Sequence, residues 1–187
     1  YHARTGSDSL RRCTEEARKA VSAAPDLGIA HAVLAAALAG RVSGEGQALD
    51  DALRREIQAH IARAMQLDGD NPMVIARLVS AYAALEDGET CLRLARRAVE
   101  LNPYWVDAHH MLGAACLSLG RTAEAILAYT EELDRFKGNE SSRNIALTYL
   151  AMSYLLEGQP VEADAAIDRA LAIRPDAHLA LKWKGII

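Results

Sequence analysis

The sequence VDAHHMLGAACLSLGRTAEAILAYTEELDRFK, residues 106–137, carries the strongest structural signal in the chain. Leu112-Gly113 is followed by a small residue, Ala125, twelve positions after the glycine, and by an aromatic residue, Tyr129, four positions further on. Gly120 separates two stretches in which apolar residues recur at helical spacing. The same pattern returns upstream and downstream, so we interpret this stretch as one repeat of a helical array.

The composition supports this interpretation. Hydrophobic residues make up 51% of the 187 residues but aromatic residues only 5%, and alanine is abundant, which favours close-packed helices over a sheet. The net charge of −4 argues against a nucleic-acid partner, because such surfaces are usually basic. No apolar stretch approaches the ~20 residues that span a membrane, so we expect no membrane association and a cytoplasmic location. The chain begins at Tyr1 without a signal-peptide pattern, and we expect it to be a segment of a longer protein.

Proline, glycine and capping residues divide the chain into expected helices. We expect residues 1–6 to be frayed and glycines 40, 44 and 46 to mark a loop. The expected helices cover residues 7–25, 28–40, 48–67, 73–86, 88–101, 105–119, 122–135, 142–156 and 160–173, with a last helix from Ala177 to the end.

Equivalent positions recur along the chain at Pro72, Val106, Asn144 and His178. The first and last of these intervals are equal, and the interval from Val106 to Asn144 is slightly longer. The additional residues fall in an expected loop, where an insertion costs little. We therefore expect one array over residues 1–187, with a partial repeat at 7–25, an irregular repeat with an insertion at 28–71, repeats at 72–105, 106–143 and 144–177, and a partial terminal helix at 178–187.

Three of these repeats share small and bulky residues in phase. The repeat that begins at Val106 has Leu112, Gly113, Ala125 and Tyr129. The next repeat has Leu147, Leu150, Ala151, Tyr154, Ala163, Ala170 and Pro175. The previous repeat has Ile75, Leu78, Tyr82, Ala98 and Pro103. This pattern resembles the tetratricopeptide-repeat family. Two positions depart from it: Cys116 stands where tyrosine is usual, and Glu132 stands where alanine is usual.

The resemblance implies an all-α fold, a right-handed α-α superhelix (tetratricopeptide-repeat solenoid) of about four helical hairpins plus partial terminal repeats. It also implies a non-enzymatic interaction scaffold, whose first helices line a concave groove that binds a helical or extended peptide segment. The groove candidates are Met73, Arg77, Ser80, Asp107, His110, Leu117, Ile145, Thr148, Tyr149, Met152 and Leu155. In place of the Lys, Asn and Arg with which some family members clamp a C-terminal carboxylate, this chain has Ala76, His110 and Thr148.

Two alternatives stay open for the partner. Another domain of the parent chain can fill the groove, or the module can form homodimers through its C-terminal helix. Leu179, Trp183 and Ile186 are the candidates for self-association. The irregular first repeat is similar to those of bacterial multidomain regulators that join such arrays to an adenylate-cyclase or DNA-binding domain.

Catalytic, cofactor and metal sites are not expected. The adjacent residues His109 and His110 point about 100° apart on a helix and have no histidine or cysteine four residues away, so a metal site is not favoured. We expect His109 to pack between repeats and His110 to face the groove. The cysteines Cys13, Cys91 and Cys116 occupy core positions of the pattern, which favours a packing role.

Overall fold

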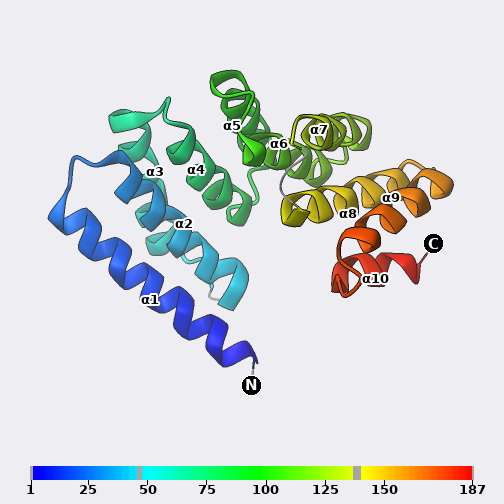
Figure 1. Cartoon of the computed structure of the whole chain (residues 1–187). Coiled ribbons are helices and arrows are strands. Elements are labelled where there is room, and N and C mark those ends of the chain that lie inside the picture. The colour runs from blue at the N-terminus through cyan, green and yellow to red at the C-terminus, as the bar shows by residue number, and fades with distance from the viewer. Residues whose placement is uncertain (1, 46–47, 137–139, 187) are drawn as a thin grey trace. The chain divides into compact units, whose positions relative to one another are not determined.

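The computed structural model describes residues 2–45, 48–136 and 140–186, and within these ranges it contains only α-helices and no strand (Figure 1). The helices are α1 (His2–Ala23), α2 (Gly28–Glu45), α3 (Asp51–Asp68), α4 (Pro72–Ala84), α5 (Gly88–Leu101), α6 (Val106–Ser118), α7 (Thr122–Arg135), α8 (Glu140–Leu156), α9 (Pro160–Ile173) and α10 (His178–Lys184). The expected all-α fold is confirmed. None of these helices is both long enough and apolar enough to cross a membrane.

The chain divides into two compact units. Unit 1 is Tyr1–Leu101 and holds α1–α5, and unit 2 is Asn102–Ile187 and holds α6–α10. The boundary coincides with Asn102-Pro103, the turn signal that separates two repeats in the sequence. Each unit has its own buried core.

Unit 1 is built around α2. This helix consists almost entirely of alanine, leucine and valine up to residue 39, and it packs against α1, α3 and α4 (Figure 1). Its side chains Leu34 and Leu38 are both 1% exposed. A helix that is apolar on nearly all sides must be covered on nearly all sides, and three neighbouring helices do so here.

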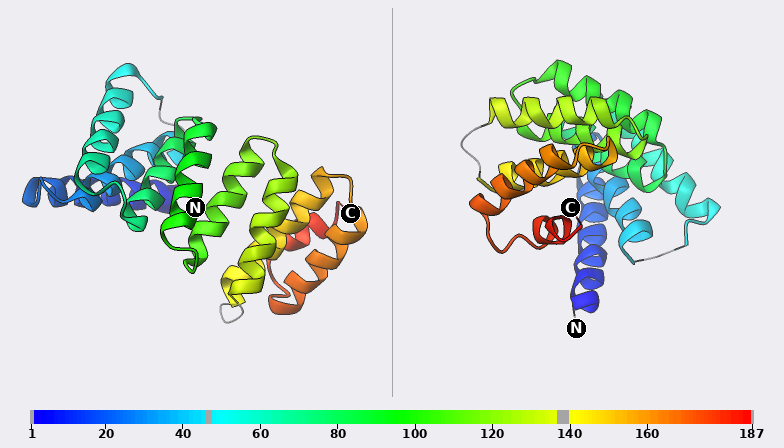
Figure 2. Two further views of the ribbon diagram at one scale, coloured as in Figure 1. Left: turned by 90° about the horizontal axis from the view of Figure 1, so that it is seen from above. Right: turned by 90° about the vertical axis from the view of Figure 1, so that its right-hand side faces the viewer.

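Unit 2 is a succession of helical pairs. α6 packs on α7, α7 on α8 and α8 on α9, while α10 contacts both α8 and α9. Figure 2 shows this order from yellow-green to red. Buried Asn144 of α8 donates a 2.7 Å hydrogen bond from Nδ2 to the carbonyl of Ala170 in α9. The same carbonyl also accepts the backbone N–H of Arg174 at 3.0 Å, so the Asn144 side chain adds a second hydrogen bond at the C-terminal end of α9 and ties α8 to it.

Small residues on one helix face large residues on its partner. A Cβ atom on Gly113 of α6 would lie 2.5 Å from Cζ of Tyr129 in α7, and Tyr129 is fully buried. At the equivalent positions of the next repeat stand Ala151 and Ile167, both also fully buried. The glycine is therefore required because the opposing ring leaves no space for a side chain.

The α4–α5, α6–α7 and α8–α9 turns each contain one left-handed residue. Gly120 (φ 68°) ends the α6 turn and Gly158 (φ 73°) ends the α8 turn. At the equivalent place after α4, one repeat before Gly120, stands Glu86 with φ 60°. A glutamate in this conformation is strained, because its Cβ crowds the backbone.

Several expected boundaries were wrong. α1 begins at His2 instead of residue 7, and α2 continues through Gly40 to Glu45 instead of ending in a loop. Gly40 lies next to α1, since a Cβ atom there would be 3.5 Å from Leu10 Cδ2, so packing outweighs the low helix propensity of glycine. α8 begins at Glu140, two residues early. The remaining expected loop residues, 46–47 and 137–139, lie outside the described ranges, as does Ile187.

The expected core position of Cys13 was also wrong, because its side chain is exposed. The buried side chains of α1 in this region are Thr14 and Ala17. α1 packs mainly against α2, and its Arg18 also pairs with Glu56 of α3 at 2.6 Å, so α1 buries only a narrow stripe. Thr14 satisfies its hydroxyl by donating to the carbonyl of Leu10 at 2.9 Å, which makes a polar residue tolerable there.

Candidate functional site

The eleven groove candidates divide between the two units. Met73, Arg77 and Ser80 lie on α4 in unit 1, at the spacing that places residues on one helix face, and all three are exposed. Met73 is 50% exposed. The other eight belong to α6 and α8 of unit 2.

Two stripes of exposed and half-buried residues meet in unit 2. Asp107, His110 and Leu117 follow one face of α6, and Ile145, Tyr149 and Met152 follow one face of α8. The rings of His110 and Tyr149 join the stripes, since their centroids lie 5.4 Å apart in an edge-to-face arrangement. We call these six residues the α6–α8 face. Leu155 lies one helical turn beyond Met152, next to the α6–α8 face, and is half-buried.

Thr148 does not belong to this face. Its side chain is 2% exposed, and its hydroxyl donates a 2.8 Å hydrogen bond to the carbonyl of Asn144 one turn earlier. The residue lies about 100° from Tyr149 around α8, so the helix that exposes one buries the other. Its expected role as a contact residue is therefore wrong.

A cluster of rings and one acid lies directly beneath the α6–α8 face. His110 also contacts Tyr129 of α7, with centroids 5.6 Å apart, and Tyr129 stacks on Tyr149 at 5.8 Å and 18°. Glu132, one turn after Tyr129, is 3% exposed, and its Oε2 lies 3.4 Å from His110 Nδ1. We call His110, Tyr129, Glu132 and Tyr149 the ring–acid cluster.

Two buried polar atoms of the ring–acid cluster lack hydrogen-bond partners among the described residues: the Tyr129 hydroxyl and Glu132 Oε2. Burial, followed by the proximity of Tyr149 and Glu132, raises the pKa of the Tyr129 hydroxyl far above its usual value. The phenol therefore stays protonated at neutral pH and can donate a hydrogen bond. Unsatisfied buried polar atoms are uncommon and costly, which marks this cluster as unusual.

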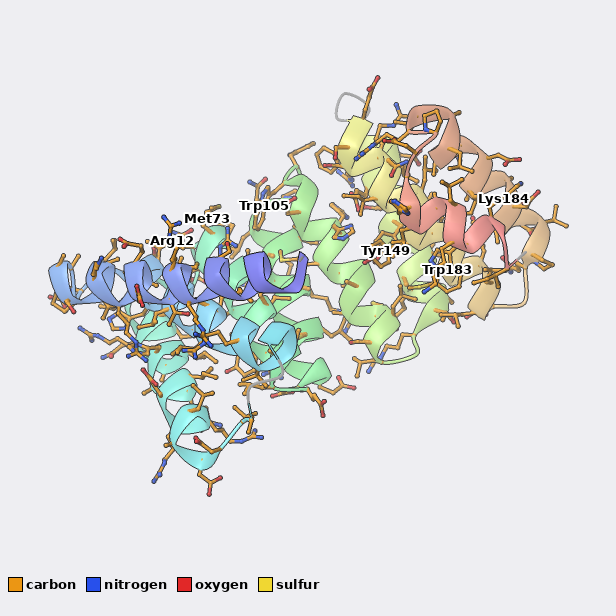
Figure 3. All side chains as sticks on the ribbon, turned by 90° about the horizontal axis from the view of Figure 1, so that it is seen from below. Arg12, Met73, Trp105, Tyr149, Trp183 and Lys184 are labelled. Carbon is orange, nitrogen blue, oxygen red and sulfur yellow. The ribbon has the colours of Figure 1, made fainter. Side chains whose placement is uncertain are left out.

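The C-terminal helix offers a second surface in unit 2. Leu179 is 44% exposed and Ile186 is 58% exposed, whereas Trp183 is half-buried. Trp183 and Tyr149 are visible from the same side of unit 2, on two helices that pack together (Figure 3). Lys184 of α10 pairs with Asp164 at 2.6 Å and with Asp168 at 2.7 Å, which holds this short helix on α9.

The histidine His109 and the cysteine Cys91 lie in the core, and among the described residues they do not form a reactive or metal-binding site. His109 is 2% exposed, and its Nε2 is 3.1 Å from the carbonyl of Pro103. Burial raises the pKa of the Cys91 thiol to about 11, so little reactive thiolate forms at neutral pH. Within the described ranges, no three His, Cys, Asp or Glu side chains gather in a way that could hold a metal ion.

One polar contact in unit 1 has no signal in the sequence. His31 of α2 and His60 of α3 face each other with their Nδ1 atoms 2.8 Å apart. His31 Nε2 lies 3.0 Å from the carbonyl of Pro25, so this nitrogen carries the proton and Nδ1 must accept one from His60. The two histidines are far apart in an irregular repeat, and spacing alone cannot bring them together.

A pocket of about 610 Å³ opens between α3 and α5 in unit 1. It is lined by Met65, Gly69, Asp70, Glu89, Leu92, Arg93, Leu94, Arg96, Arg97 and Glu100. Its three arginines are balanced by three acids, and Arg97 pairs with Asp70 at 3.0 Å and Glu100 at 3.3 Å. Because the formal charges cancel, this pocket has no preference for an anion.

Solved structures with known repeat folds are similar to this chain. YrrB, a TPR protein with an unusual peptide-binding site, superposes with a TM-score of 0.67 at 21% identity, covering 95% of this chain and 84% of YrrB. The fold is that of tetratricopeptide-repeat proteins. Two structures of MamA superpose with TM-scores of 0.64 and 0.65 at 20% identity, covering 87% and 95% of this chain and 86% and 99% of MamA. A scan against protein-family models found no match, and a search of curated proteins found none either.

Proposed function

We propose that this chain is a non-enzymatic protein-interaction module that binds a helical or extended peptide segment on the α6–α8 face of unit 2. The ring contact between His110 and Tyr149 carries the proposal, because it joins two stripes from different helices into one surface. Ile145 is 44% exposed at one end of that surface, and half-buried Met152 adds an adaptable apolar contact. Aromatic and apolar anchors at the centre of a polar rim are typical of binding surfaces.

The solved neighbours support the same function. YrrB has a peptide-binding site on a related fold, although that likeness extends to the fold and not to individual residues. A repeat fold exposes the first helix of each pair on one side, and α6 and α8 are both first helices. The partner is therefore a polypeptide that reaches across two neighbouring repeats.

A selection from randomised displayed peptides tests this proposal. Peptides selected on the full chain are titrated against a variant carrying both Ile145→Glu and Met152→Glu. The matched control is Leu127→Glu, which adds a charge at a 67% exposed leucine of α7 outside the face. We expect the double variant to lose at least about tenfold in affinity and the control to bind like wild type. The proposal is contradicted if the double variant and the Leu127→Glu control bind the peptides with equal affinity, or if the selection yields no binding peptide.

Self-association through α10 is a second candidate. Leu179, Leu181 and Ile186 are each more than two-fifths exposed, which is unusual for three apolar residues in one short segment. Sedimentation equilibrium of wild type and a Leu179→Glu, Ile186→Glu variant tests it. A wild-type dimer that the variant dissociates supports this candidate, and a wild-type monomer at micromolar concentration rejects it.

We further infer that the module is the regulatory part of a larger bacterial cytoplasmic protein. This setting depends on the similarity of the irregular first repeat to those of multidomain regulators. The sequence that flanks Tyr1 and Ile187 in the genome tests it directly, since an adjoining effector domain is required.

A further inference from the structure

Glu132 distinguishes this repeat from its neighbours. The equivalent positions of the previous and the next repeat hold Ala98 and Ala170, and both alanines are fully buried. Glu132 is 3% exposed at the same place in the helical pair. A carboxylate in an alanine position costs several kcal/mol unless an opposite charge or hydrogen bonds compensate for it.

The free protein compensates for this carboxylate incompletely. Glu132 Oε2 has no hydrogen-bond partner among the described residues, and the His110 Nδ1 atom lies 3.4 Å from it. A charge-assisted hydrogen bond between nitrogen and a carboxylate is about 2.7–2.9 Å long, so this contact is a loose one. The His110 side chain is 30% exposed and contacts the Tyr129 and Tyr149 rings, so it lies between the Glu132 carboxylate and the solvent-facing side of the cluster.

The surroundings of Glu132 suit a cation. The rings of Tyr129 and Tyr149 stack on each other, and the Tyr129 hydroxyl oxygen has no hydrogen-bond partner among the described residues. α6 contains no lysine or arginine, and its first turn adds the exposed acid Asp107. Arg143, the only basic residue of α8, lies six residues before Tyr149 and about 120° away around the helix.

We propose that the ring–acid cluster is the anchor point of the α6–α8 face, and that it accepts a lysine or arginine side chain of the bound peptide. This inference rests on the proposed function of that face. The incoming cation takes the place of the His110 ring beside Tyr149 and pairs with the Glu132 carboxylate. A buried acid and two phenol rings make the site complementary to a positive charge and unfavourable for an acidic partner.

Two small probes separate charge from apolar contact. N-acetyl-lysine N-methylamide and N-acetyl-norleucine N-methylamide have side chains with the same four-carbon stem, and only the first carries an ammonium group. Each is titrated into the isotope-labelled full chain while NMR follows the ring signals of His110 and Tyr149. We expect the lysine probe to shift these signals and to bind about tenfold tighter than the norleucine probe. Equal affinities, or no shift from the lysine probe at its solubility limit, overturn the inference.

Glu132→Gln removes the charge while keeping the shape of the side chain. We expect the lysine probe to bind this variant no better than the norleucine probe. The unfolding midpoint of the variant should stay equal or rise, because a poorly compensated buried charge has been removed. The matched control, Glu131→Gln, neutralises the adjacent exposed acid and should keep the lysine preference. If both variants lose the lysine preference equally, that preference comes from the overall negative charge of this region and not from Glu132, and the inference is overturned.

The peptide selection described above distinguishes the two proposals. If selected peptides lose binding when Ile145 and Met152 are replaced but show no enrichment of lysine or arginine, the ring–acid cluster is not a cation site while the face still binds peptide. If basic residues are enriched and their replacement by norleucine weakens binding in wild type but not in Glu132→Gln, both proposals stand.

Discussion

Units 1 and 2 each place a histidine at the fourth position of a first helix, and the two rings are anchored alike. His31 of α2 and His109 of α6 both hydrogen-bond through Nε2 to the carbonyl of a proline six residues earlier, at 3.0 and 3.1 Å. Their other nitrogens meet different groups. His31 Nδ1 faces His60 Nδ1 at 2.8 Å, whereas His109 Nδ1 lies 3.7 Å from a carboxylate oxygen of Glu131.

The two units differ in the residue that follows this shared histidine. In unit 1 the residue that follows His31 in α2 is Ala32, which is fully buried. In unit 2 the next residue is His110, which reaches a half-exposed surface and contacts Tyr149 of α8. The buried histidine is a structural element of both units, and only unit 2 adds a second ring that belongs to the candidate binding face.

The largest expected effect concerns the core of unit 2. Gly113→Leu forces a side chain into the Tyr129 ring and should destabilise α6 and α7 by about 3 kcal/mol. Hydrogen exchange measured along the full chain should show lost protection in α6 and α7, with the amides of α2 and α4 unchanged. The control Ala114→Leu enlarges the adjacent exposed residue and should leave protection intact. Unaltered exchange in Gly113→Leu would falsify the repeat register.

A medium effect is expected at the turns. Glu86 has the left-handed conformation that Gly120 and Gly158 have at equivalent positions, so Glu86→Gly should stabilise unit 1 by about 1 kcal/mol. The measurement is the urea midpoint of the full chain. Gly120→Ala is the reciprocal change in unit 2 and should lower stability, because alanine resists a positive φ. A loss of stability in Glu86→Gly would contradict the assignment of strain.

The smallest expected effect is a pH dependence of stability that arises from a histidine of unit 1. Burial, and then the nearby His31, lower the pKa of His60; Glu56 opposes this shift and Arg18 adds to it. A histidine with a lowered pKa binds fewer protons in the folded state, so unfolding takes up protons and stability falls as pH falls below the ordinary value of 6.5. Wild type should therefore have a lower urea midpoint at pH about 5.5 than at about 7.5.

Two variants identify the group responsible for this pH dependence. His60→Gln keeps a donor toward His31 but does not titrate, so its midpoint should depend less on pH than that of wild type. His178→Gln removes an exposed histidine of α10 and should behave like wild type. If wild type and His60→Gln respond to pH equally, the His31–His60 contact is not the sensitive element.

The fold could be predicted from the sequence because its signals are local and repeated. Pro72 does open α4, and Gly120 and Gly158 do form the turns inside their helical pairs with the positive φ that glycine tolerates. The prediction failed at Gly40, where contact with α1 keeps a glycine helical. It failed at Cys13 because α1 packs mainly against one helix, α2, and therefore buries a stripe too narrow to include this residue.

The candidate site was only partly accessible from the sequence. His110 and Tyr149 could be predicted from their positions on first helices, but Thr148 differs from Tyr149 by one residue and is buried. Glu132 was visible as a departure from the repeat pattern, although nothing in the sequence indicated that it meets His110. That contact joins residues of two different helices through the packing of α7 on α6, which only three-dimensional structure provides.

The most direct measurement of the central claim is the hydrogen-exchange footprint of a selected peptide on the full chain. Binding at the α6–α8 face predicts new protection in α6 around His110 and in α8 around Tyr149, with the amides of α2 and α3 near His31 and His60 unchanged. Protection confined to unit 1, or to α10 alone, would show that the peptide binds elsewhere and would contradict the account.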